Sequence, residues 1–386
     1  MWNQSSAAQP FAVRQTFNSI ASLTNVYGNP TSFPNGDPFP YTFNAAHPLF
    51  LTNASIETIS KSVQWPLVYQ FNAAIQRQLP HHVSATVAYV GTLTRHVPFF
   101  DDANYAPYAP GANTSQASID ARRPYNNNHT LGDVTNLESR ETASYHSLQI
   151  SAERRLTHNL MLSGFYVWSH NIDSVNPDGI GQGTAQDFDN LWEEKGPAAV
   201  DRRNVASISG IWSIDYYRGS NFLMKNVVNG WTISSIVSLQ SGTPVEIVTG
   251  SNNNFDSENH NRPNLVPGVS AFLDPHRSRS VSRNEWFNTA AFTPNGPGLG
   301  IGPGGADGNT PRNYLRGPGY RDIDLGILRN FHFERGIIFQ LRGEATNAFN
   351  LVSLNNPTAN LASGNNGKIT SAASPRIIQV GARLTF

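Results

Sequence analysis

The stretch from Arg376 to Phe386 alternates strictly between apolar and other side chains. Successive side chains of an extended chain point to opposite faces, so this alternation predicts a β-strand with one apolar face. About ten residues is also the length that a tilted strand needs to cross a bilayer. The apolar set is Ile378, Val380, Ala382, Leu384 and Phe386. We therefore expect a strand of a membrane-spanning sheet here.

Eight further stretches between Leu67 and Ala345 alternate in the same way. Where the apolar positions of two hairpin strands are both odd or both even, the strands keep their apolar sides on one face only if the paired positions sum to an even number. The short connections at residues 80–82, 157–159 and 333–335 have the odd lengths that this parity requires. The pattern therefore predicts about nine antiparallel strands with one shared apolar face.

Short and long connections alternate along the chain, and the long polar ones cover residues 92–140, 171–203, 240–320 and 350–375. Every tight turn then falls on one side of the sheet and every long loop on the other. This is the layout of outer-membrane β-barrels, which have short periplasmic turns and long extracellular loops. Aromatic residues gather near the expected strand ends, as interfacial girdles do. They are Trp65, Trp168, Trp212, Trp231, Phe331 and Phe386.

We expect two parts of the chain: a loop-rich segment at residues 1–63, with one weak strand within 11–20, and a barrel segment at 64–386. Lys+Arg and Asp+Glu balance at 27 each, so no basic field for nucleic acid is expected. The absence of cysteine excludes thiolate metal sites and disulfides. Residues 1–6 have neither the basic start nor the apolar core of a signal peptide, which a membrane-barrel protein needs, so we expect a fragment of a longer protein or a mis-started reading frame.

Several short motifs, in this order, resemble one family. They are Tyr145-His146-Ser147-Leu148-Gln149-Ile150, Asp201-Arg202-Arg203-Asn204, Asn229-Gly230-Trp231 with Ser241-Gly242-Thr243-Pro244, Arg262-Pro263-Asn264, Trp286-Phe287-Asn288 with Ala291-Phe292, and Arg342-Gly343-Glu344-Ala345 running into Asn347-Ala348-Phe349-Asn350. Together they resemble the C-terminal barrel of Oar-like TonB-dependent receptors, many of which carry an N-terminal carboxypeptidase-regulatory-like domain. The resemblance covers residues 65–386.

The resemblance implies a receptor in the bacterial outer membrane that takes up a large solute, such as a siderophore or an oligosaccharide. It implies contact with outer-membrane lipid, with the barrel-assembly machinery and, through an absent N-terminal part, with the TonB complex. Family barrels have about twice the strands visible here, so we expect an incomplete, C-terminal half barrel. Two other classes stay open: a non-transporting surface or adhesin barrel, and a secreted carbohydrate-active β-sandwich protein.

Five polar residues lie opposite the apolar sides of two neighbouring strands and would line the barrel lumen: Asp322, Asp324, Gln340, Arg342 and Glu344. A pair of carboxylates can serve general acid–base catalysis. An interior ladder of charges that braces a polar lumen is the interpretation we favour, because nothing else catalytic accompanies them. We expect no enzymatic activity.

Other constellations favour neither a cofactor nor a metal. Residues 300–305 match G-x-G-x-x-G literally, but proline and more glycine surround them where a strand and a helix are needed. The histidines near the expected turns lack the spacing of metal ligands. Oxygen-rich patches could attract calcium, but they lack the EF-hand spacing and favour solvated loops. These patches include Asp187, Asp189, Glu193, Asn254 and Asp256.

Aromatic residues in the outer loops could stack on sugars or siderophores, because ligand sites combine aromatic walls with a few polar groups. They are Tyr105, Tyr108, Tyr125, Trp192 and Phe255.

The aromatic residue at the end of the last expected strand has a different expected role. The resemblance implies that Phe386 is the signal that the barrel-assembly machinery reads in the last strand.

Overall fold

The computed structural model describes residues 12–14, 54–125, 131–157, 159–174, 185–257, 260–333 and 336–386. Within the expected loop-rich segment it describes β1 (Ala12–Arg14) and β2 (Ala54–Ile59), which pair antiparallel. The rest of the weak strand expected within 11–20 lies outside the described residues. β2 then pairs parallel with β5 (Leu131–Thr157), so the segment joins the main sheet through β2.

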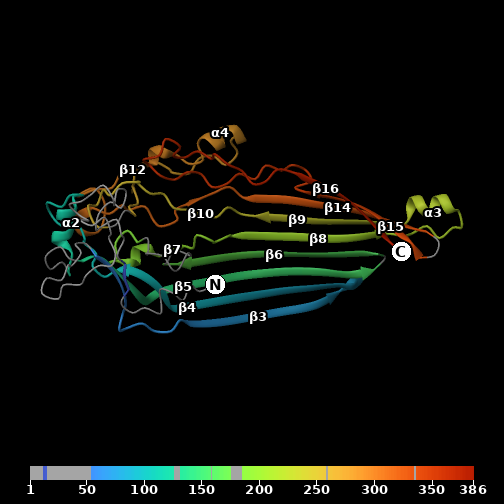
Figure 1. The fold of residues 1–386 in the computed structure, drawn as a ribbon, viewed down its shortest axis with the longest axis horizontal. Coiled ribbons are helices and arrows are strands. Elements are labelled where there is room, and N and C mark those ends of the chain that lie inside the picture. Colours follow the sequence, from blue (N-terminus) through green and yellow to red (C-terminus); the bar gives the residue numbers. More distant parts are fainter. Residues whose placement is uncertain are drawn as a thin grey trace, which may run out of the picture.

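Nine long strands form the wall of the molecule, each antiparallel to its neighbour (Figure 1). We call them the strand wall. Their spatial order is β3 (Leu67–Leu79), β4 (Val83–Asp102), β5, β6 (Leu160–Asp173), β8 (Asn204–Ile214), β9 (Trp231–Gln240), β14 (Tyr320–His332), β15 (Ile338–Thr346) and β16 (Ile377–Thr385). The prediction of about nine antiparallel strands is confirmed.

The register keeps the predicted apolar sides together across the whole strand wall. Ile208 pairs with Gly164 on one side and Val237 on the other, and Gly343 lies between Ile327 and Val380. Pairs whose apolar positions have the same parity, such as Ile327 with Gly343, sum to even numbers, and pairs of opposite parity, such as Ile208 with Val237, sum to odd numbers. In both cases the predicted apolar sides meet on one face. Many of the apolar side chains are exposed, including Ile75 at 77% and Val380 at 79%. The strand wall therefore has one apolar face turned outward, away from any core.

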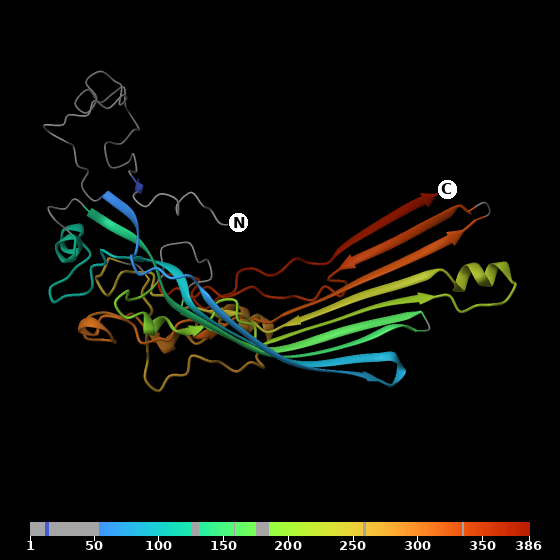
Figure 2. The ribbon, with the colours of Figure 1, turned by 90° about the horizontal axis from the view of Figure 1, so that it is seen from below.

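Tight turns and long loops separate to opposite ends of the strand wall (Figures 1 and 2). The β3–β4 turn is η3 (Pro80–His82), where His81 and His82 adopt positive φ angles of 61° and 59°. The β8–β9 connection at the same end contains α3 (Phe222–Val228). The two edges of the strand wall stay open within the described residues, because β3 pairs only with β4 and β16 only with β15.

Two predicted boundaries were wrong. We expected a loop at residues 92–140, but β4 continues to Asp102 and β5 begins at Leu131. Alternation cannot reveal these strand extensions because charged residues replace apolar ones there. A cross-strand ion pair joins them, with Arg140 of β5 3.0 Å from Asp101 of β4, and Arg140 also lies 2.7 Å from Glu138 on its own strand.

The long loops fold together into a structured layer, which we call the loop cap (residues 103–125, 185–203, 241–257, 260–319 and 347–376). It contains α2 (Gln116–Arg122), η4 (Leu191–Glu194), β7 (Gly196–Pro197), α4 (Arg279–Asn284), η5 (Thr289–Ala291) and η6 (Pro303–Gly305). β10 (Pro244–Val245) pairs with β13 (Leu315–Arg316), and β11 (Asn264–Leu265) pairs with β12 (Phe292–Thr293).

The hydrophobic core of the molecule lies in the loop cap. Phe287, Ile247 and Leu315 are at most 2% exposed, and the Phe287 and Phe292 rings meet edge to face at 5.7 Å. A second cluster joins Phe99, at the end of β4, to Tyr105 and Phe188. We expected an irregular polar region at residues 240–320, and it is instead a folded unit with a core. No helix among the described residues is long and apolar enough to cross a membrane.

Candidate functional site

The five polar residues predicted to line a lumen share the face of the strand wall opposite the apolar one. Asp322 and Asp324 lie opposite Ser238 and Ile236 of β9, while Glu344 lies opposite Gly326. Gln340 donates a hydrogen bond from Nε2 to Oδ1 of Asn330 at 2.9 Å, across the same face. Arg342 pairs with Leu328, and β16 extends the face with Gln379 and Arg383. The register therefore brings all five into one polar strip.

A hollow of about 360 Å³ lies on this polar face. Asp324 and Glu344 line it together with serines of β6, β8 and β9. Two of these serines, Ser163 and Ser209, have hydroxyls 2.7 Å apart. Asp324 Oδ1 accepts a hydrogen bond from the Asn347 backbone N–H at 3.0 Å, which orients that carboxylate. The hollow offers hydrogen-bonding groups to a polar solute or to a protein segment.

Above the strand wall, a buried ion pair holds the loop cap together. Arg262 is 1% exposed, and its Nη1 donates to both carboxylate oxygens of Glu194 at 2.7 Å. Burial by itself would lower the pKa of Arg262, but the charges of Glu194, Glu246 and Glu193 outweigh it and raise that pKa. His260 Nε2 lies 3.1 Å from Glu246 Oε2. This network links segments far apart in the sequence, which fixes the loops relative to one another.

A second buried network contains three carboxyl groups. Asn254 Nδ2 donates to Asp256 Oδ2 at 2.7 Å and to Asp307 Oδ1 at 2.9 Å, and the Tyr105 hydroxyl donates to Asp256 Oδ2 at 2.8 Å. Burial raises the pKa of Asp307 against the opposing hydrogen bond from Asn254, and with the charges of Asp187 and Asp256 the pKa reaches about 7. No group of three or more His, Asp or Glu among the described residues is arranged to hold a metal.

Ion pairs at its base connect the loop cap to the strand wall. Asp201 is 2% exposed and pairs with Arg316 and with Arg203 at 3.4 Å, and its carboxylate lies 3.7 Å from the His170 ring of β6. Arg312 reaches Asp173, at the end of β6, with its Nη1 at 2.5 Å from Oδ1. Sequence analysis placed Arg202-Arg203 only within a short motif. Arg202 donates a hydrogen bond to the Ser241 carbonyl, 39 residues away along the chain, and no local pattern reveals this contact.

The aromatic residues expected to contact a ligand separate into two groups. Tyr105 is 6% exposed and packs edge to face on Phe188, so its ring belongs to the cap interior. Tyr108 is half-buried, and its ring lies beside Gly304. Phe255 has a positive φ of 56°, and its carbonyl accepts a hydrogen bond from Arg122. Tyr125 and Trp192 are 59% and 73% exposed. Only these two offer open rings to a ligand.

The structure also places the oxygen-rich patches and the glycine-rich segment at residues 300–305. Asp187, Asn254 and Asp256 are at most 2% exposed, so the expectation of solvated oxygen-rich loops was wrong at these positions. Their packing against other loops is a tertiary effect that composition does not encode. The 300–305 segment closes a turn by a hydrogen bond from Gly300 N–H to the Gly305 carbonyl at 2.8 Å, without a helix after it.

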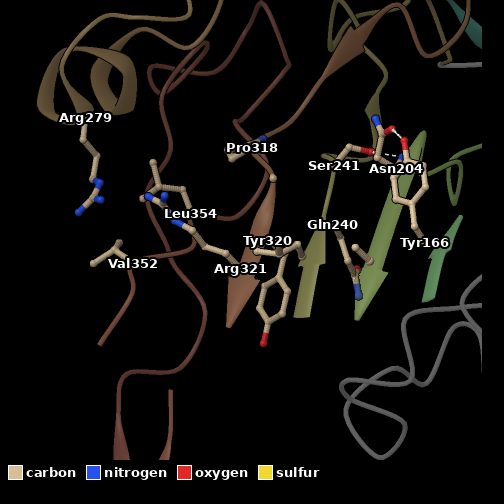
Figure 3. Close-up of a pocket in the computed structure, with 13 residues that line it drawn as sticks. Tyr166, Asn204, Gln240, Ser241, Arg279, Pro318, Tyr320, Arg321, Val352 and Leu354 are labelled. Atoms are coloured by element: carbon tan, nitrogen blue, oxygen red, sulfur yellow. Dashed lines mark hydrogen bonds between the residues drawn. The ribbon is translucent and has the colours of Figure 1, made fainter. Parts of the chain in front are cut away.

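A groove that the sequence did not predict lies where the loop cap overhangs the apolar face (Figure 3). It has a volume of about 680 Å³. Tyr166, Ala206 and Leu239 of the strand wall form one side, and Val352 and Leu354 of the β15–β16 connection form another. Arg279 and Arg321 add positive charge at its border. The groove exists because separate loops fold back over the strands.

An antiparallel sheet with one apolar outward face, one polar face, tight turns at one end and long loops at the other is the wall of a membrane β-barrel. The chain matches the profile of the family described as "Outer membrane beta barrel domain" over residues 1–379, and it belongs to that family. The protein is therefore located in the bacterial outer membrane, with its apolar face toward lipid. A search among curated proteins found no match.

Distant likenesses to solved structures accompany this match. The outer membrane transporter YddB from Escherichia coli is 8% identical, with a TM-score of 0.47 over 87% of this chain and 34% of its own. FpvA of P. aeruginosa, solved with heterologous pyoverdines, is 9% identical, with a TM-score of 0.38 over 86% of this chain and 27% of its own. The chain thus spans about a third or less of the length of these proteins, and likenesses this distant carry no functional argument.

Proposed function

We propose that the chain belongs to an Oar-like TonB-dependent receptor that binds a large solute at its loop cap and takes it up through the barrel. The observation that carries this proposal is the combination of a continuous polar face with a folded cap above one end of it. A surface barrel has no need of a cap whose loops are fixed by buried ion pairs. A receptor benefits, because loops that are ordered before binding lose less entropy on capture.

The exposed cap residues suit the proposed solute classes. Trp192 and Tyr125 offer open aromatic faces, and Lys195 Nζ lies 4.7 Å from the centre of the Trp192 ring. Such a pair can stack on a sugar or on the aromatic part of a siderophore. The polar hollow at Asp324 and Glu344 would then receive the solute or a plug segment on its way through. In this proposal the chain catalyses no reaction, and energy comes from the TonB complex.

The family motifs quoted above support the finer assignment to Oar-like receptors, and family membership supports a barrel inserted by the assembly machinery. Phe386 lies directly after β16 and is 96% exposed. The proposal gives this residue the role of the insertion signal. Because the chain spans only part of the length of the solved transporters, uptake is proposed for the intact receptor.

Uptake measurements in cells that make the intact receptor test the proposal. The probes are a ferric hydroxamate siderophore, a ferric catecholate siderophore and a starch oligosaccharide, each labelled. We expect accumulation of one probe that stops when an uncoupler collapses the proton-motive force. Trp192→Ala should weaken capture about tenfold, as expected for the loss of one stacking contact. Trp168→Ala, an exposed tryptophan on the lipid face, is the matched control and should leave uptake unchanged.

Uptake that continues in the presence of the uncoupler would contradict energising by TonB. Attachment of the cells to a surface without uptake of any probe would favour the adhesin alternative. Recovery of the protein in the soluble periplasm would instead favour the secreted β-sandwich class.

A further inference from the structure

An arginine lies on the lipid face at the tight-turn end of the strand wall. Arg329 of β14 pairs with Trp231 of β9 and Leu341 of β15, so its side chain points to the same side as Ile327 and Phe331. Its guanidinium carbon lies 4.6 Å from the ring centres of both Trp231 and Phe331. A cation on a lipid-facing surface is costly unless it reaches the interface or meets an anion. Its aromatic neighbours are typical of the interface.

The short helix α3 is attached to this arginine. The Val227 carbonyl oxygen accepts one hydrogen bond from Arg329 Nη1 at 3.0 Å and another from Trp231 Nε1 at 2.9 Å. Carbonyl groups in the last turn of a helix lack intrahelical partners and favour a nearby cation. Met224 and Val227 remain 49% and 64% exposed. The end of α3 is therefore fixed beside the lipid face and still exposes apolar atoms. These features are typical of a helix at the membrane–water interface.

A groove of about 640 Å³ begins at this arginine and continues along the lipid face. Its walls include Ile327, Leu341 and Val380. Gly343 lies between Ile327 and Val380 in the sheet, and a Cβ atom built there would meet no other atom within 4 Å. The missing side chain therefore leaves an open trough in the sheet surface. An apolar trough with a cation at one end has the chemistry of a site for one acyl chain and its charged headgroup.

Arg329 is 7% exposed, but it lines the groove, where its guanidinium keeps donors for such a headgroup. Within the described part of the chain it makes one side-chain hydrogen bond, to Val227, and no ion pair with a carboxylate. A guanidinium carries five N–H donors in a fork that matches two phosphate oxygens. The rings of Trp231 and Phe331 hold the fork in place, so little side-chain entropy is lost when a phosphate binds.

We propose that this groove, formed by α3, Trp231, Arg329 and Gly343, is a binding site for one anionic glycerophospholipid of the inner leaflet. The phosphate contacts the Arg329 guanidinium, and one acyl chain lies in the trough over Gly343. Bound lipid then fastens α3 to the strand wall. The site rests on the orientation that the proposed function uses, with tight turns toward the periplasm. It does not rest on uptake, so a failed uptake assay leaves it standing.

Native mass spectrometry of the intact membrane protein tests this site. The protein is released from vesicles of phosphatidylethanolamine and phosphatidylglycerol, and retained phosphatidylglycerol is counted. Arg329→Gln should reduce retention about tenfold, since a charge-assisted contact is lost. Gly343→Leu should reduce it comparably by filling the trough while keeping the arginine. Arg329→Lys should retain an amount of phosphatidylglycerol between those of the wild type and Arg329→Gln, because lysine keeps the charge without the forked N–H donors. Arg321→Gln, on the same face at the other end of β14, is the control.

Heat-modifiable gel migration must confirm that each variant is folded, and Gly343→Leu provides the test if Arg329→Gln does not fold. Equal retention in the wild type, Arg329→Gln and Gly343→Leu would overturn the proposal. So would equal retention of phosphatidylethanolamine and phosphatidylglycerol by the wild type. In a second set of vesicles that also contain lipopolysaccharide, preferential retention of lipopolysaccharide through Arg329 would overturn it too, because that glycolipid belongs to the outer leaflet.

Discussion

The strand wall and the loop cap distribute their residues in opposite ways. The wall exposes apolar side chains such as Val380 and turns polar ones such as Glu344 to the other face. The cap buries Phe287 at 2% exposure and also buries charges such as Arg262 at 1%. The comparison shows that one chain is adapted to two solvents: lipid surrounds the wall, and water surrounds the cap.

Breaking the buried ion pair should have the largest effect, and only in the cap. Arg262→Ala leaves the buried Glu194 without its ion-pair partner, which should destabilise the cap by roughly 3–5 kcal/mol. Hydrogen exchange of cap peptides measures this, and the strand wall should keep its protection. The exposed Arg376→Ala is the control and should change protection very little. Unchanged exchange in Arg262→Ala would show that the pair does not hold the loops.

The cap should also lose stability as pH rises. Asp307 has a pKa of about 7 in the folded protein and an ordinary value of 3.8. Because the pKa of Asp307 is higher in the folded protein than in the unfolded one, the contribution of Asp307 to cap stability is fully present below pH 4. It is lost as pH rises through 7. The loss is at most about 4 kcal/mol. Hydrogen exchange of the cap between pH 5 and pH 8, corrected for intrinsic rates, should show it, and Asp307→Asn should flatten the dependence.

A single charge should distinguish the two faces of the wall. Val380→Arg puts a cation on the lipid face and should cost about 2–4 kcal/mol of folding free energy in vesicles. Gln379→Arg, one residue away on the polar face, should cost far less. Urea titrations of both variants in the same vesicles measure the difference. Equal costs would contradict the assignment of the lipid face.

The smallest effect belongs to the cap surface. Lys195→Ala removes the contact with the Trp192 ring, and both side chains are exposed. An exposed cation–π pair contributes about 0.5–1 kcal/mol, so cap stability should change by no more than that. Thermal unfolding of the cap, followed by near-ultraviolet circular dichroism, provides the measurement. A larger loss would mean that Trp192 is part of the cap framework and not an open surface for solute.

The wall could be predicted because its information is local. Alternation at Ile378, Val380 and Ala382, together with the odd turn at residues 80–82, determines strand, face and register without knowledge of the rest of the chain. The polar strip at Asp322 and Glu344 followed from the same parity. The family resemblance was confirmed at the level of an outer-membrane barrel.

The cap could not be predicted in this way. The burial of Tyr105 depends on Asp256, which lies 151 residues further along the chain. The pairing of Arg262 with Glu194 joins residues 68 apart. No periodic pattern encodes such contacts, since they form only when separate loops pack together. The oxygen-rich stretches therefore looked like solvated loops although several of their members are buried.

The sequence alone determined that this protein is a β-sheet with one lipid-facing side. Apolar and polar residues alternate within each strand, and this alternation can be recognised without knowing which strand pairs with it. Tertiary structure alone decided which loop residues are buried, where the core lies and how Arg329, Trp231 and α3 meet. Those features arise from contacts between distant segments, and the free energy of such contacts depends on geometry that composition does not carry.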